Sequence, residues 1–225
     1  MRIVFVTLMG DLIEAAFSTS ILGRAVSSGI MTSEVIDPRD YCYDRHGKVD
    51  ERPYGGAPGM LMKAEPVALA LENALATGPA LLIAPDPTGP KFTQSDAREW
   101  SREKTLVFVC GHYEGIDERL FSAFPIQKVS LGDFVLTNGA AAALVMADAT
   151  VRQIPGVLGN EGSLESDSFG TSGGLAAPNY TRPPVWRGHA VPSILLSGDH
   201  AKVQAFQRHE GREITAQVRP DLIEE

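Results

Sequence analysis

Residues 107–119 read Val107-Phe108-Val109-Cys110-Gly111-His112-Tyr113-Glu114-Gly115-Ile116-Asp117-Glu118-Arg119. The first four residues are apolar and favour a β-strand, which Gly111 ends. A polar loop follows as far as Gly115, and Asp117 then begins a predicted helix. Open α/β sheets bind ligands at such junctions, outside the carboxyl ends of their strands. Taken alone, the pattern fits either a binding site or an ordinary strand–loop–helix corner.

Short β-favouring runs recur along the chain and alternate with helical patterns. Predicted strands cover residues 2–8, 33–36, 80–84, 107–110 and 128–131. Predicted helices cover residues 11–29, 65–75, 95–104, a short stretch from 117, 140–151 and 200–209. This alternation through residue 150 predicts an α/β domain with a mainly parallel sheet.

The composition is that of a globular protein that is not broadly basic. Of the 225 residues, 44% are hydrophobic and 21% are charged, and the formal net charge is −8. Folded domains have such values. The negative charge argues against indiscriminate nucleic-acid binding, but it leaves an RNA substrate open if basic residues cluster on one face.

The cysteines and the N-terminus indicate a compartment. Cys42 and Cys110 lack the spacing of a zinc site or a disulfide framework, so Cys110 is interpreted as a buried apolar residue in a reducing compartment. Asp11 interrupts the N-terminal apolar run before a signal peptide could form, and no apolar run is long enough to span a membrane. We therefore expect a cytoplasmic protein without membrane segments.

Residues 37–62 form a long polar loop in which tyrosines are interleaved with arginines. The loop holds Tyr41, Tyr43, Tyr54, Arg39, Arg45, Arg52 and the stretch Gly55-Gly56-Ala57-Pro58-Gly59. Loops of this length are usually functional or disordered. The pattern suits stacking on RNA bases and binding of phosphates. It equally suits a solvated loop whose tyrosines pack back on the domain, and composition does not separate the two.

The composition changes after Gly156. Residues 159–174 are rich in Gly, Ser and Glu and predict a flexible linker, which on composition alone is a plain tether. The linker separates a main domain, residues 1–158, from a short, mainly helical C-terminal domain, residues 175–225.

Several further motifs, in order along the chain, resemble one protein family. They are Asp50–Met62, Leu131–Leu136, Arg152–Gly159, Asp167–Phe169 and Tyr180–Pro183. With residues 111–119 they resemble the TrmD family of bacterial tRNA (guanine-N1)-methyltransferases, which belongs to the SPOUT methyltransferases. The resemblance spans nearly the whole chain, and several motifs in the same order are far more specific than one.

The resemblance implies a parallel sheet with a deep trefoil knot at the cofactor site. Periodicity could not indicate such a knot, because knots are so rare that the default rule excludes them. Loops around 84–85, 111–114 and 131–139 would bind S-adenosylmethionine. The implied cofactor-binding residues are Ala84, Pro85, Gly111, Tyr113, Glu114, Leu131, Gly132, Asp133, Phe134, Val135, Leu136, Asn138 and Gly139. The chain has no GxGxxG motif, which disfavours a Rossmann-type methyltransferase.

The implied reaction is methyl transfer from S-adenosylmethionine to N1 of the guanosine 3′ to the anticodon of tRNA, position 37. Guanine N1 carries a proton at neutral pH, so a general base is needed, and the resemblance assigns Asp167 to this role. Arg152 would stabilise the negative charge that develops toward O6. Without the resemblance, Asp167 is one loop carboxylate and Arg152 is a helix-end arginine.

The resemblance also implies two partners, which are tRNA and a second copy of the chain. The family forms homodimers whose active sites are shared across the interface. Arg182 and the tyrosines that flank Gly55-Gly56 are candidates for holding the anticodon stem. Magnesium is associated with the family, but no carboxylate cluster in the sequence has a readable ligand pattern, so no metal ligand is assigned.

Three departures from the family pattern motivate an alternative function. The turn Asp86–Lys91 lacks the family's arginine, Asn138–Ala142 replaces Gly-Gly-Glu-Leu-Pro, and the C-terminal domain is short. The alternative is a paralogue that binds cofactor and RNA without turnover. The presence of Asp167, Arg152 and Glu114 favours the active enzyme.

Overall fold

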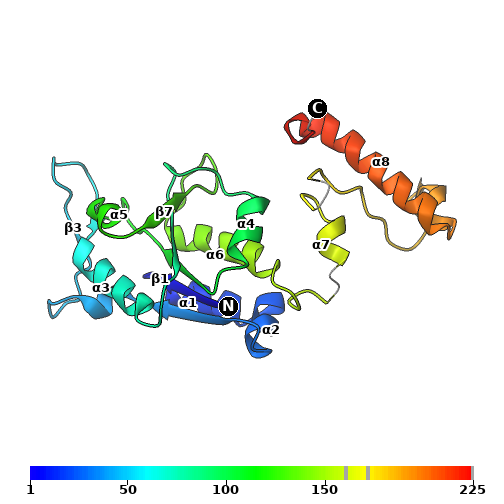
Figure 1. Ribbon diagram of the computed structural model, residues 1–225. Helices are drawn as coiled ribbons and strands as arrows, with labels where there is room; N and C mark the ends of the chain where they lie inside the picture. The colour runs from blue at the N-terminus through cyan, green and yellow to red at the C-terminus, as the bar shows by residue number, and fades with distance from the viewer. Residues whose placement is uncertain (160–161, 171–172, 224–225) are drawn as a thin grey trace. The chain divides into compact units, whose positions relative to one another are not determined.

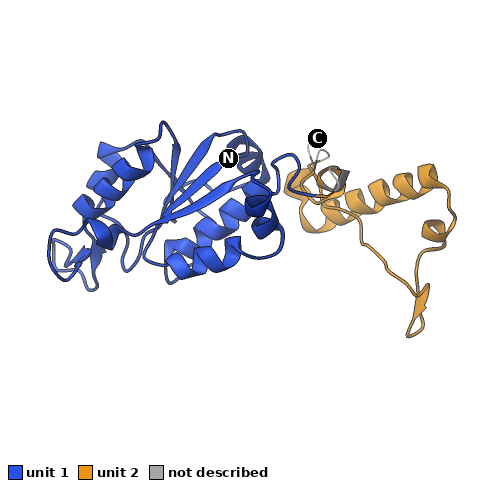
Figure 2. Cartoon of the chain, turned by 90° about the horizontal axis from the view of Figure 1, so that it is seen from below, with its two compact units in different colours: residues 1–158 blue, residues 159–225 orange. Residues whose placement is uncertain are grey.

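The computed structural model describes residues 1–159, 162–170 and 173–223. The chain divides into two compact units, unit 1 from Met1 to Leu158 and unit 2 from Gly159 to Glu225 (Figure 2). Unit 1 holds a large sheet with its helices, and unit 2 consists mainly of helix and extended chain.

A five-stranded sheet forms the centre of unit 1 (Figure 1). Its strands are β1 (Arg2–Val6), β2 (Thr32–Ile36), β5 (Leu81–Pro85), β6 (Thr105–Val109) and β7 (Ile126–Val129), in the spatial order β2-β1-β6-β5-β7. Every neighbouring pair is parallel. Alternate residues of β1 face opposite sides of the sheet. Ile3 and Phe5 belong to the hydrophobic core on one side, and Val4 and Val6 belong to the core on the other side. The predicted α/β class with a mainly parallel sheet is confirmed.

The helices of unit 1 cover both faces of the sheet. They are α1 (Gly10–Phe17), α2 (Ser20–Ser27), α3 (Ala64–Leu75), α4 (Gln94–Trp100), α5 (Arg119–Ala123) and α6 (Gly139–Val151). Helices α1, α2, α4 and α6 share a core with Phe5 and Phe108, whose rings stack 5.4 Å apart. Helices α3 and α5 pack on the other face through Leu71 and Leu120.

The helix predicted over residues 11–29 is wrong as a single element. The chain turns after α1, and Ser20 has a φ of +52° at the start of α2, so two helices form. The N-cap position of α1 is Met9, and Asp11 lies in the first turn of the helix.

Other boundaries also differ from the prediction, and two of them have a visible cause. The helix predicted from residue 95 begins at Gln94, because Thr93 caps it and forms a capping box with Asp96. Strand β7 ends at Val129, not Leu131, because Ser130 pairs instead with Lys91 in an isolated bridge.

The long loop carries short elements of its own. They are the 3₁₀ turn η1 (Pro38–Tyr41) and the paired strands β3 (Asp50–Glu51) and β4 (Leu61–Met62). Tyr41 packs against the core, whereas Tyr43 is 83% and Tyr54 99% exposed. Two of the three tyrosines therefore do not pack back on the unit.

Unit 2 is built around one long helix. Its elements are α7 (Gly162–Ser166), β8 (Val185–Trp186), β9 (His189–Ala190), η2 (Ser193–Leu196), α8 (His200–Val218) and η3 (Pro220–Leu222). Helix α8 extends well past the predicted residues 200–209. It buries only Gly211 and Thr215, so its apolar pattern was too weak to mark its end. The predicted linker residues contain α7.

Candidate active site

The carboxyl ends of three neighbouring strands meet at one edge of the sheet. Strand β5 ends at Pro85, β6 at Val109 and β7 at Val129, and the three run parallel. The loops singled out by the resemblance follow these ends, so the topology places them along the same edge. Ala84 and Pro85 belong to β5 itself, and Ala84 is buried.

The loops after β6 and β7 are in backbone contact. The Gly139 N–H donates to the Gly111 carbonyl at 2.7 Å, and His112 and Asn138 form an antiparallel bridge. A Cβ on Gly139 would lie 2.9 Å from the Gly111 nitrogen, closer than side chains approach, so only glycine permits this contact. The Asn138 side chain accepts from the Ala140 N–H at 3.0 Å and caps α6. Helix α6 thus begins at the junction of the two loops.

The loop after β6 is also held by the end of the long loop. The Glu114 N–H donates to the Met60 carbonyl at 2.9 Å, and the Met62 N–H donates to the Gly115 carbonyl at 3.0 Å. Tyr113 is 48% exposed and has a φ of +58°, a conformation that costs an ordinary residue about 1–2 kcal/mol. Such strain concentrates at functional sites. The structure therefore brings Tyr113 and Glu114 together with residues 60–62.

Apolar side chains stand exposed in the loop after β7. Phe134 is 56%, Val135 94% and Leu136 42% exposed. The start of this loop is anchored to the turn after β5, because the Phe92 N–H donates to the Ser130 carbonyl at 2.8 Å. Clustered apolar surface of this kind marks interaction sites.

Arg152 lies at the other end of α6 from these loops. It is the half-buried C-cap residue of α6. A helix rises about 1.5 Å per residue, so the length of α6 separates Arg152 from Gly139 by about 20 Å. Gly156, a few residues on, lies beside Ile30, which precedes β2 at the amino edge of the sheet. The structure does not bring Arg152 to the loops of its own chain.

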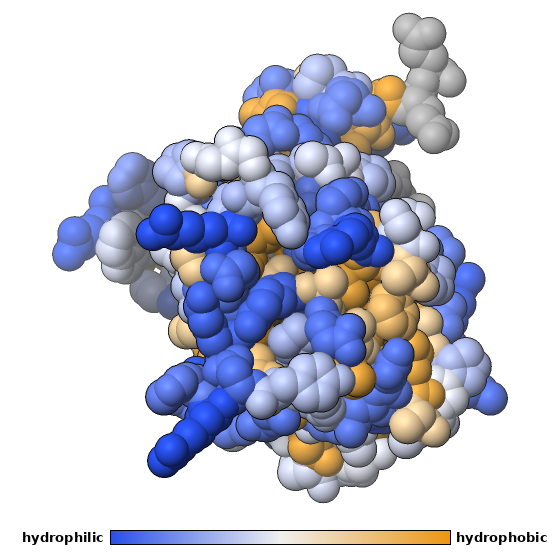
Figure 3. Space-filling model, turned by 90° about the vertical axis from the view of Figure 1, so that its left-hand side faces the viewer, coloured by the Kyte–Doolittle hydropathy of each residue, from blue (hydrophilic) through white to orange (hydrophobic). Residues whose placement is uncertain are grey.

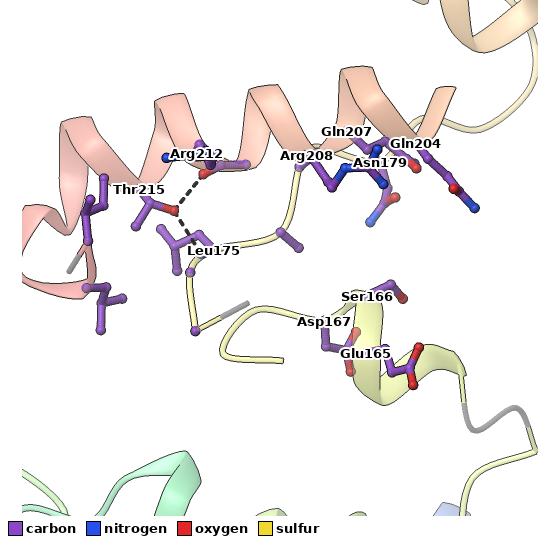
Figure 4. A pocket seen from close by; sticks show the side chains of 17 residues that line it. Glu165, Ser166, Asp167, Leu175, Asn179, Gln204, Gln207, Arg208, Arg212 and Thr215 are labelled. Atoms are coloured by element: carbon purple, nitrogen blue, oxygen red, sulfur yellow. Dashed lines mark hydrogen bonds between the residues drawn. The ribbon is translucent and has the colours of Figure 1, made fainter. Parts of the chain in front are cut away.

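Asp167 lines a cavity of about 990 Å³ within unit 2 (Figure 4). Asp167 follows α7 and is half-buried, and the cavity wall opposite it is α8, with Gln204, Gln207 and Arg208. Leu175 and Ala176, which also line the cavity, are hydrogen-bonded to α8 on one side and to the residue after Asp167 on the other. Thr215 Oγ1 on α8 accepts from the Leu175 N–H at 2.9 Å, and Ser168 Oγ accepts from the Ala176 N–H at 3.0 Å.

A second cavity, of about 690 Å³, lies in unit 1 between the β3–β4 pair, α3 and α5. Leu61, Ala68 and Phe124 line it, and on this side of the molecule apolar surface is exposed among charged side chains (Figure 3). Tyr54 also lines this cavity, whereas Arg182 lies in unit 2. Hydrogen bonds from the Arg119 guanidinium hold the pKa of Asp117, at the rim, below its usual range.

Comparison with known proteins identifies the family. The model of the family "tRNA (Guanine-1)-methyltransferase TrmD" matches residues 1–225. A tRNA (guanine-N(1)-)-methyltransferase of Rhodococcus jostii is 48% identical over 99% of this chain and 100% of its own length. The chain belongs to the TrmD family. Equally named proteins of Nocardia farcinica and Geobacter metallireducens are 47% and 46% identical, over 99% and 100% of this chain and 97% and 91% of their own lengths.

As a TrmD-family member the chain is a tRNA methyltransferase, whose substrates are a methyl donor and tRNA. The alternative without turnover is not favoured, because relatives that match over nearly their whole lengths carry the name of the enzyme. Among the described residues, no helix has the length and apolar character needed to cross a membrane. The same residues contain no group of three or more His, Cys, Asp or Glu side chains placed to hold a metal ion.

Sequence reasoning missed the α8 side chains that line the cavity with Asp167. Gln204, Arg208 and Arg212 recur every four residues, a spacing that places them on one helix face. That polar periodicity was readable, but Asp167 could be paired with α8 only once the chain had folded back through residues 173–179.

Proposed function

We propose that this chain transfers the methyl group of S-adenosylmethionine to N1 of guanosine 37, the nucleotide 3′ to the anticodon of tRNA. The observation that carries the proposal is the meeting of the loops after β5, β6 and β7 at one sheet edge, in a member of the TrmD family. S-adenosylmethionine would supply an electrophilic methyl group. The Gly111–Gly139 contact supports its binding there, since glycines let the backbone approach a ligand, and Phe134 and Leu136 offer apolar surface.

Asp167 is proposed as the general base that removes the proton from guanine N1. Its half-buried position in a polar cavity supports this role, because a base must be accessible to the RNA yet held in place. Arg152 is proposed to stabilise the negative charge that develops toward O6. The remaining rate would come from alignment of the reacting atoms.

The active site is proposed to be shared between two copies of the chain. The separation of about 20 Å between Arg152 and Gly139 along α6 supports this arrangement, since Arg152 would then act at the loops of the partner. Leu12 on α1 and Val145 on α6 are 37% and 51% exposed on helices that pack together. A second copy would cover this apolar surface.

The trefoil knot and the cytoplasmic location belong to the same proposal. The residues after β7 bond both to Phe92, beyond the β5 turn, and to Gly111, and these ties support a knot formed by the three loops. A protein whose substrate is tRNA would work in the cytoplasm.

The reaction is tested by transfer of labelled methyl from S-adenosylmethionine to a tRNA transcript with guanosine at position 37. The matched control is the same transcript with that base changed. Label in the first transcript alone is expected. No label in either, or equal label in both, would contradict the proposed reaction or its target.

Shared sites are tested by mixing two inactive variants. Gly139→Val disrupts the loop junction, and Asp167→Ala removes the base. If each site uses loops of one copy and Asp167 of the other, random pairing restores about a quarter of wild-type activity, because half the dimers have one intact site. A mixture as inactive as the separate variants would contradict sharing.

A further inference from the structure

The cavity in unit 2 contains two cations that the proposed chemistry does not use. Arg208 and Arg212 both line it, one helical turn apart on α8. Gln204 lies one turn before Arg208 on the same face, and Asn179 lies in the extended chain that passes α8 (Figure 4). The cavity thus has a wall of hydrogen-bond donors.

Neither arginine has an ion-pair partner among the residues that the structure describes. In the same described part of the chain, Arg2, Arg39, Arg119 and Arg219 do have partners, which are Glu34, Asp37, Asp117 and Asp221. Like charges four residues apart repel one another along a helix. Two unpaired guanidinium groups on one cavity wall are therefore arranged for an anion from outside.

The wall opposite the arginines is acidic. Glu165 and Asp167 lie there, at the end of α7 (Figure 4). A phosphate is attracted to the α8 side and repelled from the α7 side, so an RNA nucleotide would enter with its backbone toward Arg208 and Arg212. Its base would then point toward Asp167.

The packing of α8 keeps the two walls apart. Gly211 lies against Leu175, where a Cβ would be 2.7 Å from the Leu175 carbonyl oxygen, and Thr215 holds the Leu175 N–H. These two contacts fix the position of α8 in the turns that follow Arg208. The remaining volume of about 990 Å³ lies at the upper end of the range of about 300–1,000 Å³ typical of ligand pockets.

We propose that this cavity is a phosphodiester-binding site, in which Arg208 and Arg212 hold the RNA backbone next to the nucleotide presented to Asp167. Gln204 and Asn179 contribute hydrogen bonds to phosphate or ribose. Guanidinium groups bind phosphate oxygens through two parallel N–H donors, which orients the backbone as well as attracting it. Arg208 and Arg212 are positioning residues, and the inference rests on the proposed function for the identity of the RNA.

The test compares two double variants of the full chain, each of which removes two positive charges from α8 or its C-cap residue. Arg208→Gln/Arg212→Gln alters the cavity, whereas Lys202→Gln/Arg219→Gln alters cations outside it that pair with Asp199 and Asp221. Binding of the tRNA transcript is titrated at several salt concentrations. Methyl transfer is assayed separately, and circular dichroism verifies folding.

The cavity variant is expected to weaken tRNA binding at least ten-fold and to reduce the salt slope by about two, about one for each lost phosphate contact. KM for tRNA should rise by a larger factor than kcat falls, while affinity for S-adenosylmethionine should not change. The control variant should bind like wild type. Arg208→Lys/Arg212→Lys should recover the salt slope and part of the affinity, because lysine keeps the positive charge but lacks the two parallel N–H donors of a guanidinium group.

Equal binding by the cavity and control variants would overturn the inference, as would failure of the lysine variant to recover the salt slope. These outcomes are independent of turnover. A wild-type chain that binds tRNA without methylating it would contradict the proposed function, and the binding comparison would still decide the role of the cavity.

Discussion

The two sides of the proposed active site are built differently. In unit 1 the loops rest on a buried parallel sheet and are joined by backbone bonds, such as the 2.7 Å bond from Gly139 to Gly111. In unit 2 the chain beside Asp167 is held by hydrogen bonds to side chains, from the Leu175 N–H to Thr215 and from the Ala176 N–H to Ser168. The helix that carries Thr215, α8, buries only two residues.

The difference bears on what each side can recognise. A junction of glycine backbones accepts no added atoms, so it suits a small ligand of one fixed shape. Exposed side chains on a helix can adjust, which suits a large RNA. Regions with few buried contacts also open more easily, so unit 2 should be the less stable of the two.

The largest effect is expected from Asp167→Ala, which removes the proposed base from unit 2 and leaves unit 1 unchanged. General-base catalysis contributes about 10²–10⁴-fold, so kcat for methyl transfer should fall by that factor, while calorimetry should show unchanged affinity for S-adenosylmethionine. Asp221→Ala, which breaks an exposed ion pair in the same unit, should be nearly neutral. Retention of most of the activity by Asp167→Ala would refute the assignment.

Gly139→Ala tests the side of the proposed active site that belongs to unit 1. The new Cβ would lie 2.9 Å from the Gly111 nitrogen and 3.3 Å from the Cys110 Cα, neither of which can move freely. Overpacking of this kind costs about 1–3 kcal/mol, so calorimetry should show S-adenosylmethionine binding weakened by roughly ten-fold or more. Gly159→Ala is the matched control, because a Cβ there meets no described atom within 4 Å. Normal affinity in Gly139→Ala would show that the junction is not rigid.

Thr215→Val tests whether a change in unit 2 affects tRNA binding without affecting cofactor binding. The substitution keeps the shape but leaves the half-buried Leu175 N–H without its acceptor, at a cost of about 1 kcal/mol or more. Thermal melting should show a destabilised unit 2 and titration a several-fold loss of tRNA affinity. Affinity for S-adenosylmethionine should stay the same. Thr215→Ser keeps the acceptor and should retain tRNA binding, whereas equal losses for both ligands would mean that the sides are not independent.

The smallest effect concerns Cys110, which directly precedes the loop of unit 1. Burial raises the pKa of its thiol to about 12, so a thiol reagent at pH 8 should modify Cys42 in the folded protein and both cysteines only after unfolding. The native state holds this proton more tightly than the unfolded chain does. The stabilisation that comes from the raised pKa of Cys110 is therefore fully present below about pH 8.5 and is lost as pH rises toward 12. Rapid modification of Cys110 at pH 8 would show that the base of the loop is open to water.

Much of unit 1 was readable from the sequence, because its central strands β1, β5 and β6 are largely apolar runs. Residues 107–115 gave a strand and a loop where β6 and its loop are found. Boundaries set by backbone conformation were missed. The split at Ser20 is an example, since nothing in its side chain signals a positive φ.

By itself the sequence determined the α/β class and, through ordered motifs, the family, because hydrophobic period and motif order are local properties of the chain. Only the tertiary structure decided which residues meet. Gly139 touches Gly111, Glu114 bonds to Met60, and Arg208 faces the cavity of Asp167, each across a gap in sequence. Such contacts depend on how strands and helices pack, which is set by the burial of their shared apolar faces and not by the spacing of the residues that come together.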